Sequence, residues 1–332
     1  MPDIFGFVSD LAYHILGNGK SRVAFIYIPT TILIAYVAYV RAHGANVVAF
    51  WRYFAPVEVY GHDSHIVDIK IMVFAAVLRV LGLMSFTIMT TIGAVLTMGL
   101  LQGLTGWERV AVEWTTGRFV VLAIVFALVA DFCTYWVHRI HHQNQVLWPL
   151  HKLHHSAEVL TPITLYRKHP LYDAIGSVSS SFVIGGVMGI VLFCFAGSVE
   201  TWQIAGINAV YFFFNMLGGN LRHSHVWVSF GPVMSHIFIS PAMHQIHHSR
   251  DPRHYDTNYG EMFALWDWLF GTIYIPKEKE AIEFGLSDEH GQRIVQPHDS
   301  LTNALLVPIR EMAEELERRL ERRKAVAERS EA

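Results

Sequence analysis

The chain has 332 residues, of which 52% are apolar and 16% are charged, and its mean hydropathy is +0.32. Soluble domains carry about 45–50% apolar and about 25% charged residues, so this composition indicates a membrane protein and excludes a disordered chain. A net charge of −3 argues against nucleic acid as a partner, and two cysteines are too few for a disulfide scaffold. The unusual feature is the 20 histidines, against 25 lysines and arginines together.

Four or five apolar stretches are candidates for membrane spans, because about 20 apolar residues are needed to cross a bilayer, and the last two are either spans or a hairpin that does not fully cross. A shorter segment with Lys70 and Arg79 precedes the second stretch and is typical of a helix in the membrane interface. Few residues separate the last two stretches, which predicts a tight hairpin. The N-terminus lacks the features of a cleaved signal peptide. The stretches are 23–40, 80–101, 119–137, 177–196 and 202–217, and the interfacial segment is 69–79.

Lysines and arginines gather in the loops on one side of these spans, which predicts the orientation. The opposite loops hold Arg109 and Arg118, while Lys20 and Arg22 are exceptions to the pattern. We therefore expect an integral, multi-pass membrane protein. Its predicted fold is all-α: a polytopic membrane helix bundle with a cytoplasmic, histidine-rich helical cap. The residues that define the cytoplasmic side are Arg41, Arg52, Arg139, Lys152, Arg167, Lys168 and Arg222.

Three regions follow from this pattern. Residues 1–117 contain two spans and the interfacial helix, residues 118–275 contain the third span, the hairpin and most histidines, and residues 276–332 contain a loop and a charged helix. The helix is expected over 308–332 with a narrow apolar stripe, which favours a solvated, docked helix over a coiled coil with a partner. The stripe consists of Ile309, Met312, Leu316 and Leu320.

Fourteen of the 20 histidines lie between His138 and His254, and three clusters there read H-x-x-H-H. Residues at i, i+3 and i+4 share one face of a helix, with Cβ atoms about 5–6 Å apart, so three imidazoles can converge on one cation. Neutral imidazole is a good ligand for Zn, Cu, Fe and Ni. Three such clusters supply enough nitrogens for two metal ions. The clusters are His138/His141/His142, His151/His154/His155 and His244/His247/His248.

Chance explains one H-x-x-x-H pair easily, and a lone histidine on an apolar face is usually a hydrogen-bonded core residue. Three clusters of matched spacing on one side of the predicted membrane favour a metal site instead. The H-E-x-x-H motif of zinc proteases is absent, and so is the H-x4-D motif of membrane acyltransferases.

Polar residues near the clusters are further candidates for the site. Asp131 lies two helical turns before His138, where a carboxylate can orient a ligand imidazole; pairing with an arginine at the helix end is an equal alternative. His169, His223 and His225 lie near span ends on the same side and are possible extra ligands. Asn258 and Asp267 either support the ligands or act as turn and cap residues.

The segments around these residues resemble the fatty acid hydroxylase / sterol desaturase superfamily. The match covers about residues 118–275, and the order, spacing and flanking residues of the motifs all agree. The segments are D-F-C-T-Y-W-V-H-R at 131–139, L-W-P-L-H-K-L-H-H-S at 147–156, S-P-A-M-H-Q-I-H-H-S at 240–249, D-T-N-Y-G at 256–260 and W-D-W-L-F-G-T at 266–272.

This resemblance implies a non-haem di-iron enzyme whose two iron ions activate O₂ on the cytoplasmic side. His169 lies in an Arg-x-His-Pro element seen in part of the family and is the next candidate ligand. His225 stands where many relatives have Asn, and His141 departs from the common pattern and is expected to be a bystander. Asp131 and Asn258 are the candidates for catalytic residues. The implied ligands are His138, His142, His151, His154, His155, His223, His244, His247 and His248.

The expected reaction is hydroxylation or desaturation of a C–H bond in a lipid such as a sterol or fatty acyl chain, with O₂ as co-substrate and two electrons. No haem domain and no Gly-rich flavin or nicotinamide fingerprint occurs in the sequence, so an external donor is expected: a ferredoxin, cytochrome b5 or a reductase. A membrane metal transporter would need ionisable residues at mid-depth in the spans, which nearly lack them. A zinc-dependent lipid hydrolase would need only three ligands and a general base.

Overall fold

The computed structural model describes residues 4–18, 24–106, 115–194, 201–288 and 290–331, and within them every regular element is a helix. The predicted all-α fold is therefore confirmed. Four helical segments are long and apolar enough to cross a membrane. They are Phe25–His43, which includes α2 (Ile28–His43), and the helices α6 (Thr87–Thr105), α7 (Thr116–Gln143) and α9 (Pro170–Cys194).

The structure decides the fifth stretch and corrects the bounds of the second. The stretch 202–217 forms α10 (Thr201–Met216), whose 16 residues extend about 24 Å and are too short for a hydrocarbon core of about 30 Å. The stretch 80–101 begins too early, because α5 (Asp63–Val80) continues to Val80 and Gly82, at φ 74°, separates it from α6. The predicted interfacial segment 69–79 is the second half of α5. The link 195–200 lies outside the described residues.

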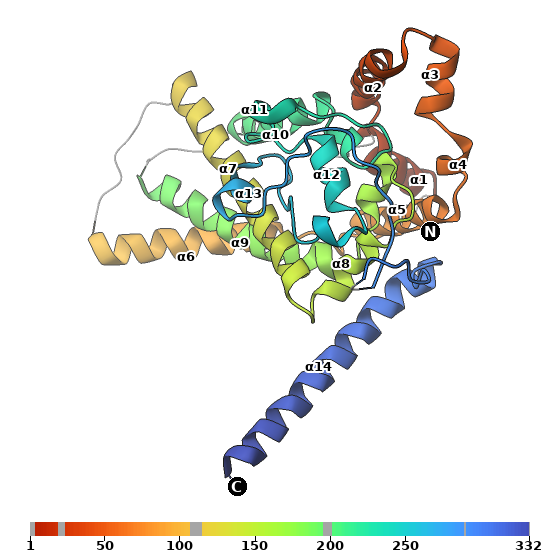
Figure 1. Cartoon of the computed structure of the whole chain (residues 1–332). Helices are drawn as coiled ribbons and strands as arrows, with labels where there is room; N and C mark the ends of the chain where they lie inside the picture. Colours follow the sequence, from red (N-terminus) through yellow and green to blue (C-terminus); the bar gives the residue numbers. More distant parts are fainter. Residues whose placement is uncertain (1–3, 19–23, 107–114, 195–200, 289, 332) are drawn as a thin grey trace.

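Helices α6 and α9 pack closely because glycines line their contact. A Cβ atom at Gly185 would lie 2.2 Å from the Thr90 carbonyl oxygen, and one at Gly189 would lie 2.5 Å from that of Ala94. Glycines four residues apart let two backbones approach, which is how helices associate in lipid, where the hydrophobic effect gives no preference for contact. Figure 1 shows these two helices beside α7.

Helix α7 joins the membrane region to the histidine-rich region. Its 28 residues extend about 42 Å, more than a hydrocarbon core of about 30 Å, so its last turns reach beyond the apolar layer. His138 and His142 lie on those turns. The length of the helix therefore places the first histidine cluster at the edge of the membrane.

The cap surrounds the end of α7. It consists of two short buried helices, α8 (Trp148–His155) and α12 (Pro241–His247), with α13 (Leu265–Leu269) and long loops around them (Figure 1). Ser240 caps α12 by accepting a hydrogen bond from the Met243 N–H at 3.3 Å. The described part of 271–298 has no helix. The remaining α-helices are α1 (Ile4–Ala12), α3 (Val47–Phe54), α4 (Val57–Tyr60) and α11 (Gly231–Met234).

A buried ion pair fixes α8 in the cap. The Arg167 guanidinium and the Asp68 carboxylate are both fully buried, with Nη1 and Oδ1 2.8 Å apart. Arg167 also donates to the Leu153 carbonyl, to the Ser156 hydroxyl and to the His298 carbonyl. A buried guanidinium is tolerated only when its donors are satisfied, and this one binds α5, the end of α8 and the segment before the C-terminal helix together.

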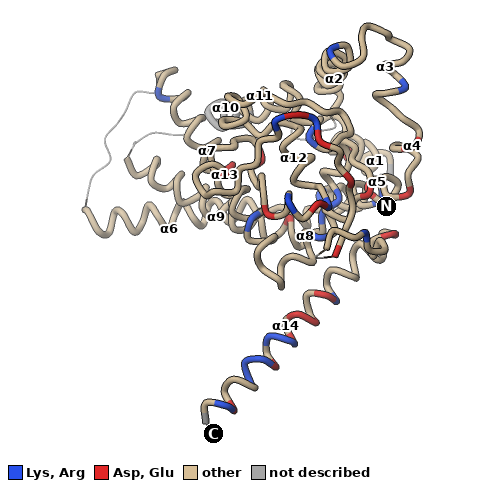
Figure 2. Tube along the Cα trace, in the orientation of Figure 1, with Lys and Arg blue, Asp and Glu red and all other residues tan. Residues whose placement is uncertain are grey.

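The C-terminal helix α14 (Leu301–Glu331) begins seven residues before the predicted start and continues through Pro308. Its first turns pack on the cap, where Ala304 is buried with Val67, Ile71 and Leu153. The predicted docking stripe is wrong in its outer half, because Leu316 and Leu320 are 46% and 57% exposed. Figures 1 and 2 show this outer half projecting from the body, with alternating bands of acidic and basic residues.

Candidate metal centre

Nine histidines from separate parts of the chain meet in two adjacent groups. Within each group, the potential ligand nitrogens all lie within 4.8 Å of one another. The groups touch, since the rings of His155 and His248 stack with centroids 4.6 Å apart. The five-histidine group contains His138, His142, His151, His155 and His247; the four-histidine group contains His154, His223, His244 and His248.

The nitrogens in each group approach one another at the spacing of metal ligands. In the five-histidine group, Nε2 of His155 lies 3.1 Å from Nε2 of His142 and 3.2 Å from that of His151. In the other group, Nε2 of His223 lies 3.1 Å from that of His154 and 2.9 Å from that of His244. Two nitrogens that each bind one ion at about 2.1 Å at right angles are about 3.0 Å apart. The observed distances therefore fit a shared cation in each group.

The buried imidazoles are held in the neutral form that binds metals. Burial lowers the pKa of His247 to about 4. It lowers the pKa of the other cap histidines well below the usual value, and the neighbouring histidines add to the effect. Ring nitrogens of both groups have no hydrogen-bond partner among the described residues. These buried, unpartnered nitrogens are His138 Nε2, His151 Nδ1, His154 Nδ1, His244 Nδ1, His247 Nε2 and His248 Nε2.

One loop orients two ligands of the five-histidine group. The Nδ1–H of His138 donates to the Tyr259 carbonyl at 2.8 Å, and that of His247 donates to the Thr257 carbonyl at 2.7 Å. A donor at Nδ1 leaves the lone pair on Nε2, so both rings present the nitrogen that faces the group.

Asp267 and Asn258 hold this loop and contact backbone, not the ligand rings. The Asp267 carboxylate accepts from the N–H groups of Tyr259 and Gly260 at 2.8 and 2.7 Å. Asn258, at φ 56°, donates to the carbonyls of Met243 and Tyr274 and accepts from the Tyr274 N–H. Backbone groups occupy both the donors and the acceptor of the Asn258 side-chain amide. Asn258 is therefore a turn residue that positions the loop, and the predicted catalytic role is not supported.

The predicted orientation of His138 by Asp131 is wrong. The Asp131 carboxylate accepts hydrogen bonds from the Met262 and Phe263 N–H groups and from the Trp266 indole, at 2.9–3.1 Å. These bonds fix the segment that follows the 257–260 loop against α7. The alternative pairing with an arginine is not observed either, because three neutral donors already surround the carboxylate.

His169, His141 and His225 lie outside both groups. His169 was expected to be a tenth ligand, but its Nδ1 accepts from the Leu171 N–H and its Nε2 donates to the Leu305 carbonyl, so neither nitrogen is available for a metal. His141 bonds the Val137 carbonyl, and His225 bonds that of Tyr53. We remove His169 from the candidate ligands for this reason.

Three residues around the groups were missed in the sequence. The Trp148 ring lies 5.0 Å from that of His142 and 5.6 Å from that of His155. Tyr172 stacks on His151, and Arg167 fixes the end of α8. Trp148 and Arg167 stand within or beside the motifs that carry the histidines, but nothing in a motif shows which rings touch.

The fold and the site together define a membrane protein with a buried histidine centre suited to two metal ions. Comparison with known families agrees: residues 123–272 match the model of the fatty acid hydroxylase family, which confirms the resemblance. The matched segment covers a little less than half of the chain, and all nine grouped histidines lie within it.

Individual relatives match about half of the chain. It is 32% identical over 175 residues to an ornithine lipid hydroxylase, OlsE, of Rhizobium tropici, covering 53% of this chain and 47% of that protein. It is 31% identical over 160 residues to alkylglycerol monooxygenase of Xenopus tropicalis, covering 48% and 32%. It is 29% identical over 159 residues to a Delta(7)-sterol 5(6)-desaturase, ERG3A, of Gibberella zeae, covering 46% and 38%.

The similarity is thus confined to a part of each of these relatives. The chain spans between about a third and about a half of the length of these proteins. No solved structure matches the chain.

Proposed function

We propose that this chain is a membrane-bound lipid oxygenase that holds one iron ion in each histidine group and hydroxylates or desaturates a lipid C–H bond. The observation that carries the proposal is the convergence of nine imidazoles, eight of them buried, in two touching groups. Imidazole suits iron as well as zinc or copper, and the matched family and relatives favour iron.

The chemistry requires such a centre because an alkane-like C–H bond offers no group for acid–base catalysis. Bound iron would supply the activation of O₂ that side chains cannot perform. Hydroxylation consumes the lipid, O₂, two electrons and two protons and yields the alcohol and one water. Desaturation uses the same co-substrates, removes two hydrogens from the lipid and yields two waters.

The residues of the chain position and protect this centre. The two helices α8 and α12, the end of α7 and the segment at His223 hold the imidazoles, and the 257–260 loop orients His138 and His247. Because α7 is both a span and a ligand helix, a lipid can reach the site from the bilayer. The lysine and arginine distribution supports a cytoplasmic position of the site.

The ornithine lipid and alkylglycerol named for two relatives suggest a lipid with a polar head, and the third relative is named for a sterol. We therefore expect the substrate of this chain to be a polar membrane lipid, and a sterol is the second candidate class.

Two other functions fit the structure less well. A transporter needs ionisable residues along its path, but α6 contains none and α9 contains only Asp173, in its first turn. A zinc hydrolase needs a carboxylate base at the metal. Within the described residues both groups consist of histidine alone. The Asp256 carboxylate lies 3.9 Å from His142 Nδ1, but the Asp256 side chain is largely exposed.

The test combines metal analysis with lipid mass spectrometry on the full chain in nanodiscs. We expect about two irons per chain, and lipid that gains one oxygen from isotopically labelled O₂ or loses two hydrogens. One zinc per chain, with water-derived oxygen in a cleaved head group, would establish the hydrolase instead. His236→Ala, an exposed histidine outside both groups, serves as the control and should keep full metal content.

A further inference from the structure

Two arginines mark the apolar length of α7. Arg118 and Arg139 are 21 residues apart, or about 32 Å along the helix axis, which matches a hydrocarbon core of about 30 Å. Asp131 is the one charged residue between them and lies eight residues before Arg139. This carboxylate is therefore about 12 Å inside the apolar layer, or about 9 Å inside it for a helix tilted by about 40°.

A segment of the cap lies beside α7 at this depth. The Asp131 carboxylate accepts from the Met262 and Phe263 N–H groups, as described above. The ring of Trp266 lies 5.0 Å from that of Phe132, and the ring of Phe270 lies 5.1 Å from that of Trp136. Segment 262–270, which contains α13, therefore runs alongside the apolar part of α7 (Figure 1).

Helix α11 is joined to this segment by backbone pairing. The Ile239 N–H donates to the Met262 carbonyl at 3.0 Å, and the Ala264 N–H donates to the Ile237 carbonyl at 2.9 Å. Met262 is buried in one cluster with Ala127 of α7 and Phe214 of α10. Because Ala127 stands four residues deeper in the span than Asp131, this pairing holds the end of α11 at the level of the apolar layer.

The backbone of both segments is prepared for an apolar surrounding. Non-helical chain is tolerated at membrane depth only where its polar groups find partners in the protein. The N–H groups of residues 235–238 all donate to carbonyls of α11, and those of Met262 and Phe263 are bound by Asp131. This role explains why an aspartate stands in a span without a cationic partner, since its carboxylate is surrounded by three neutral donors.

The exposed side chains of α11 and α13 are mainly large and apolar. No Asp, Glu, Lys or Arg occurs from 223 to 249, and the one such residue from 262 to 276, Asp267, is fully buried. An apolar surface of this kind marks an interaction site, and exposed tryptophan is typical of the membrane interface. The exposed large apolar residues are Val233, Met234, Ile237, Leu265, Trp268 and Leu269.

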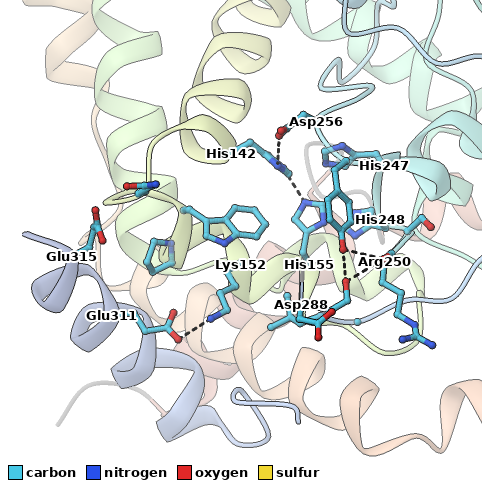
Figure 3. Close-up of a pocket in the computed structure, with 18 of the residues that line it drawn as sticks. His142, Lys152, His155, His247, His248, Arg250, Asp256, Asp288, Glu311 and Glu315 are labelled. Carbon is cyan, nitrogen blue, oxygen red and sulfur yellow. Dashed lines mark hydrogen bonds and ion pairs between the residues drawn. The ribbon is translucent and has the colours of Figure 1, made fainter. Parts of the chain in front are cut away.

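The side of the cap that carries α14 has the opposite character. A cavity of about 690 Å³ between the histidine groups and α14 is lined by charged side chains, among them Lys152, Arg250, Glu311 and Glu315 (Figure 3). None of the described residues of α11 or α13 lines it. Charged side chains favour water, so the cap has a watery side at α14 and an apolar side at α11 and α13.

We propose that α11 and α13 are immersed in the leaflet on the side of the histidine groups, where acyl chains cover their exposed apolar side chains. Continuity with α7 favours lipid as the occupant, because segment 262–270 touches the spanning part of that helix and shares its depth. The inference requires α7 to cross the membrane, but it requires neither iron nor catalysis.

Immersion links the bilayer to the metal centre through Asp267. This residue lies between Trp266, which contacts α7, and the exposed Trp268. Its carboxylate accepts from the N–H groups of the 257–260 loop, whose carbonyls orient two ligand imidazoles. The leaflet therefore helps to hold the loop that positions one half of the centre.

The primary test measures the depth of a spin label on the iron-free full chain, with one copy per nanodisc and Cys133→Ala/Cys194→Ala as background. Leu269→Cys is compared with Leu320→Cys on α14, because the two leucines are 58% and 57% exposed. Oxygen concentrates in hydrocarbon and a water-soluble nickel chelate is excluded from it. The ratio of the collision rates with oxygen and with the chelate should be at least about tenfold higher at position 269 than at position 320.

A second measurement uses native tryptophans and needs no label. Lipids brominated in the upper part of the acyl chain quench tryptophans that they touch. The emission lost in Trp268→Phe should be quenched at least about twice as strongly as that lost in Trp148→Phe, because Trp148 lines the polar cavity and Trp268 faces lipid.

Two results would overturn the proposal. Equal collision ratios at positions 269 and 320 would place α13 in water. Low collision rates with both reagents at position 269, together with no quenching of Trp268, would show that protein covers this face. Because both measurements are made without iron, a failure of lipid oxidation would refute the proposed function and leave the depth result standing.

Discussion

The two histidine groups are similar in composition but differ in what holds them. In the five-histidine group, His138 and His247 are each fixed by a backbone carbonyl of the 257–260 loop. In the four-histidine group, Nδ1 of His244 has no such partner among the described residues. A loop therefore orients one group, while helix packing positions the other, and the two should respond differently to the same kind of damage.

The largest effect is expected from removing one ligand in each group. His154→Ala leaves three ligands in its group, whereas His151→Ala leaves four. We therefore expect His154→Ala to lose about one of two irons and His151→Ala to retain more iron than His154→Ala. Both should lower activity by more than about 100-fold, the upper range seen for residues that only support a ligand. Metal content per chain and lipid turnover measure this. Equal iron loss in both variants would contradict the difference in ligand number.

The next effect tests helix packing, on which both groups depend. Arg167→Met leaves the Asp68 carboxylate buried without its partner and should destabilise the fold by about 3–5 kcal/mol. Thermal unfolding in detergent, together with iron content, measures it, and both groups should lose metal. The double variant Arg167→Met/Asp68→Leu should recover most of the stability; if it is no better than the single variant, the buried charge is not the cause.

A loop variant should separate the groups. Asp267→Ala frees the Tyr259 and Gly260 N–H groups and loosens the loop that orients His138 and His247. We expect iron affinity to fall about 10–100-fold in the five-histidine group only. Competition with a chelator should then show one weakened and one unchanged iron. Asp267→Asn keeps an acceptor oxygen and should show a smaller loss, while two equally weakened irons would refute the distinction.

The smallest effect concerns acid stability outside both groups. Burial lowers the pKa of His298 to about 3, against about 6.5 for an exposed histidine. The unfolded chain therefore binds this proton first, and stability present above about pH 6.5 is lost as pH falls toward 3, by about 1.4 kcal/mol per pH unit. Comparing unfolding of the metal-free chain and His298→Leu at pH 7 and pH 5 measures this contribution. An equal pH dependence in both would show that other groups cause the acid loss.

Much of the site could be predicted because its signal is local. Spacings of three and four residues place imidazoles on one face of a helix, and the nine grouped histidines were all expected as ligands. The spans followed from hydropathy, apart from α10, which is apolar but too short. Polar residues were less predictable: Asp131 and Asn258 stand near the ligands in sequence, yet both bond to backbone.

The sequence by itself determined that this protein is helical, lies in a membrane and carries clustered imidazoles for metal ions, because these properties depend on composition and short-range periodicity. Only the tertiary structure decided how the rings are divided. His154 and His155 are adjacent in α8, and His247 and His248 are adjacent at the end of α12, yet each pair is split between the two groups. Neighbouring residues on a helix point about 100° apart, so the packing of α7, α8 and α12 decides which group each of their rings joins.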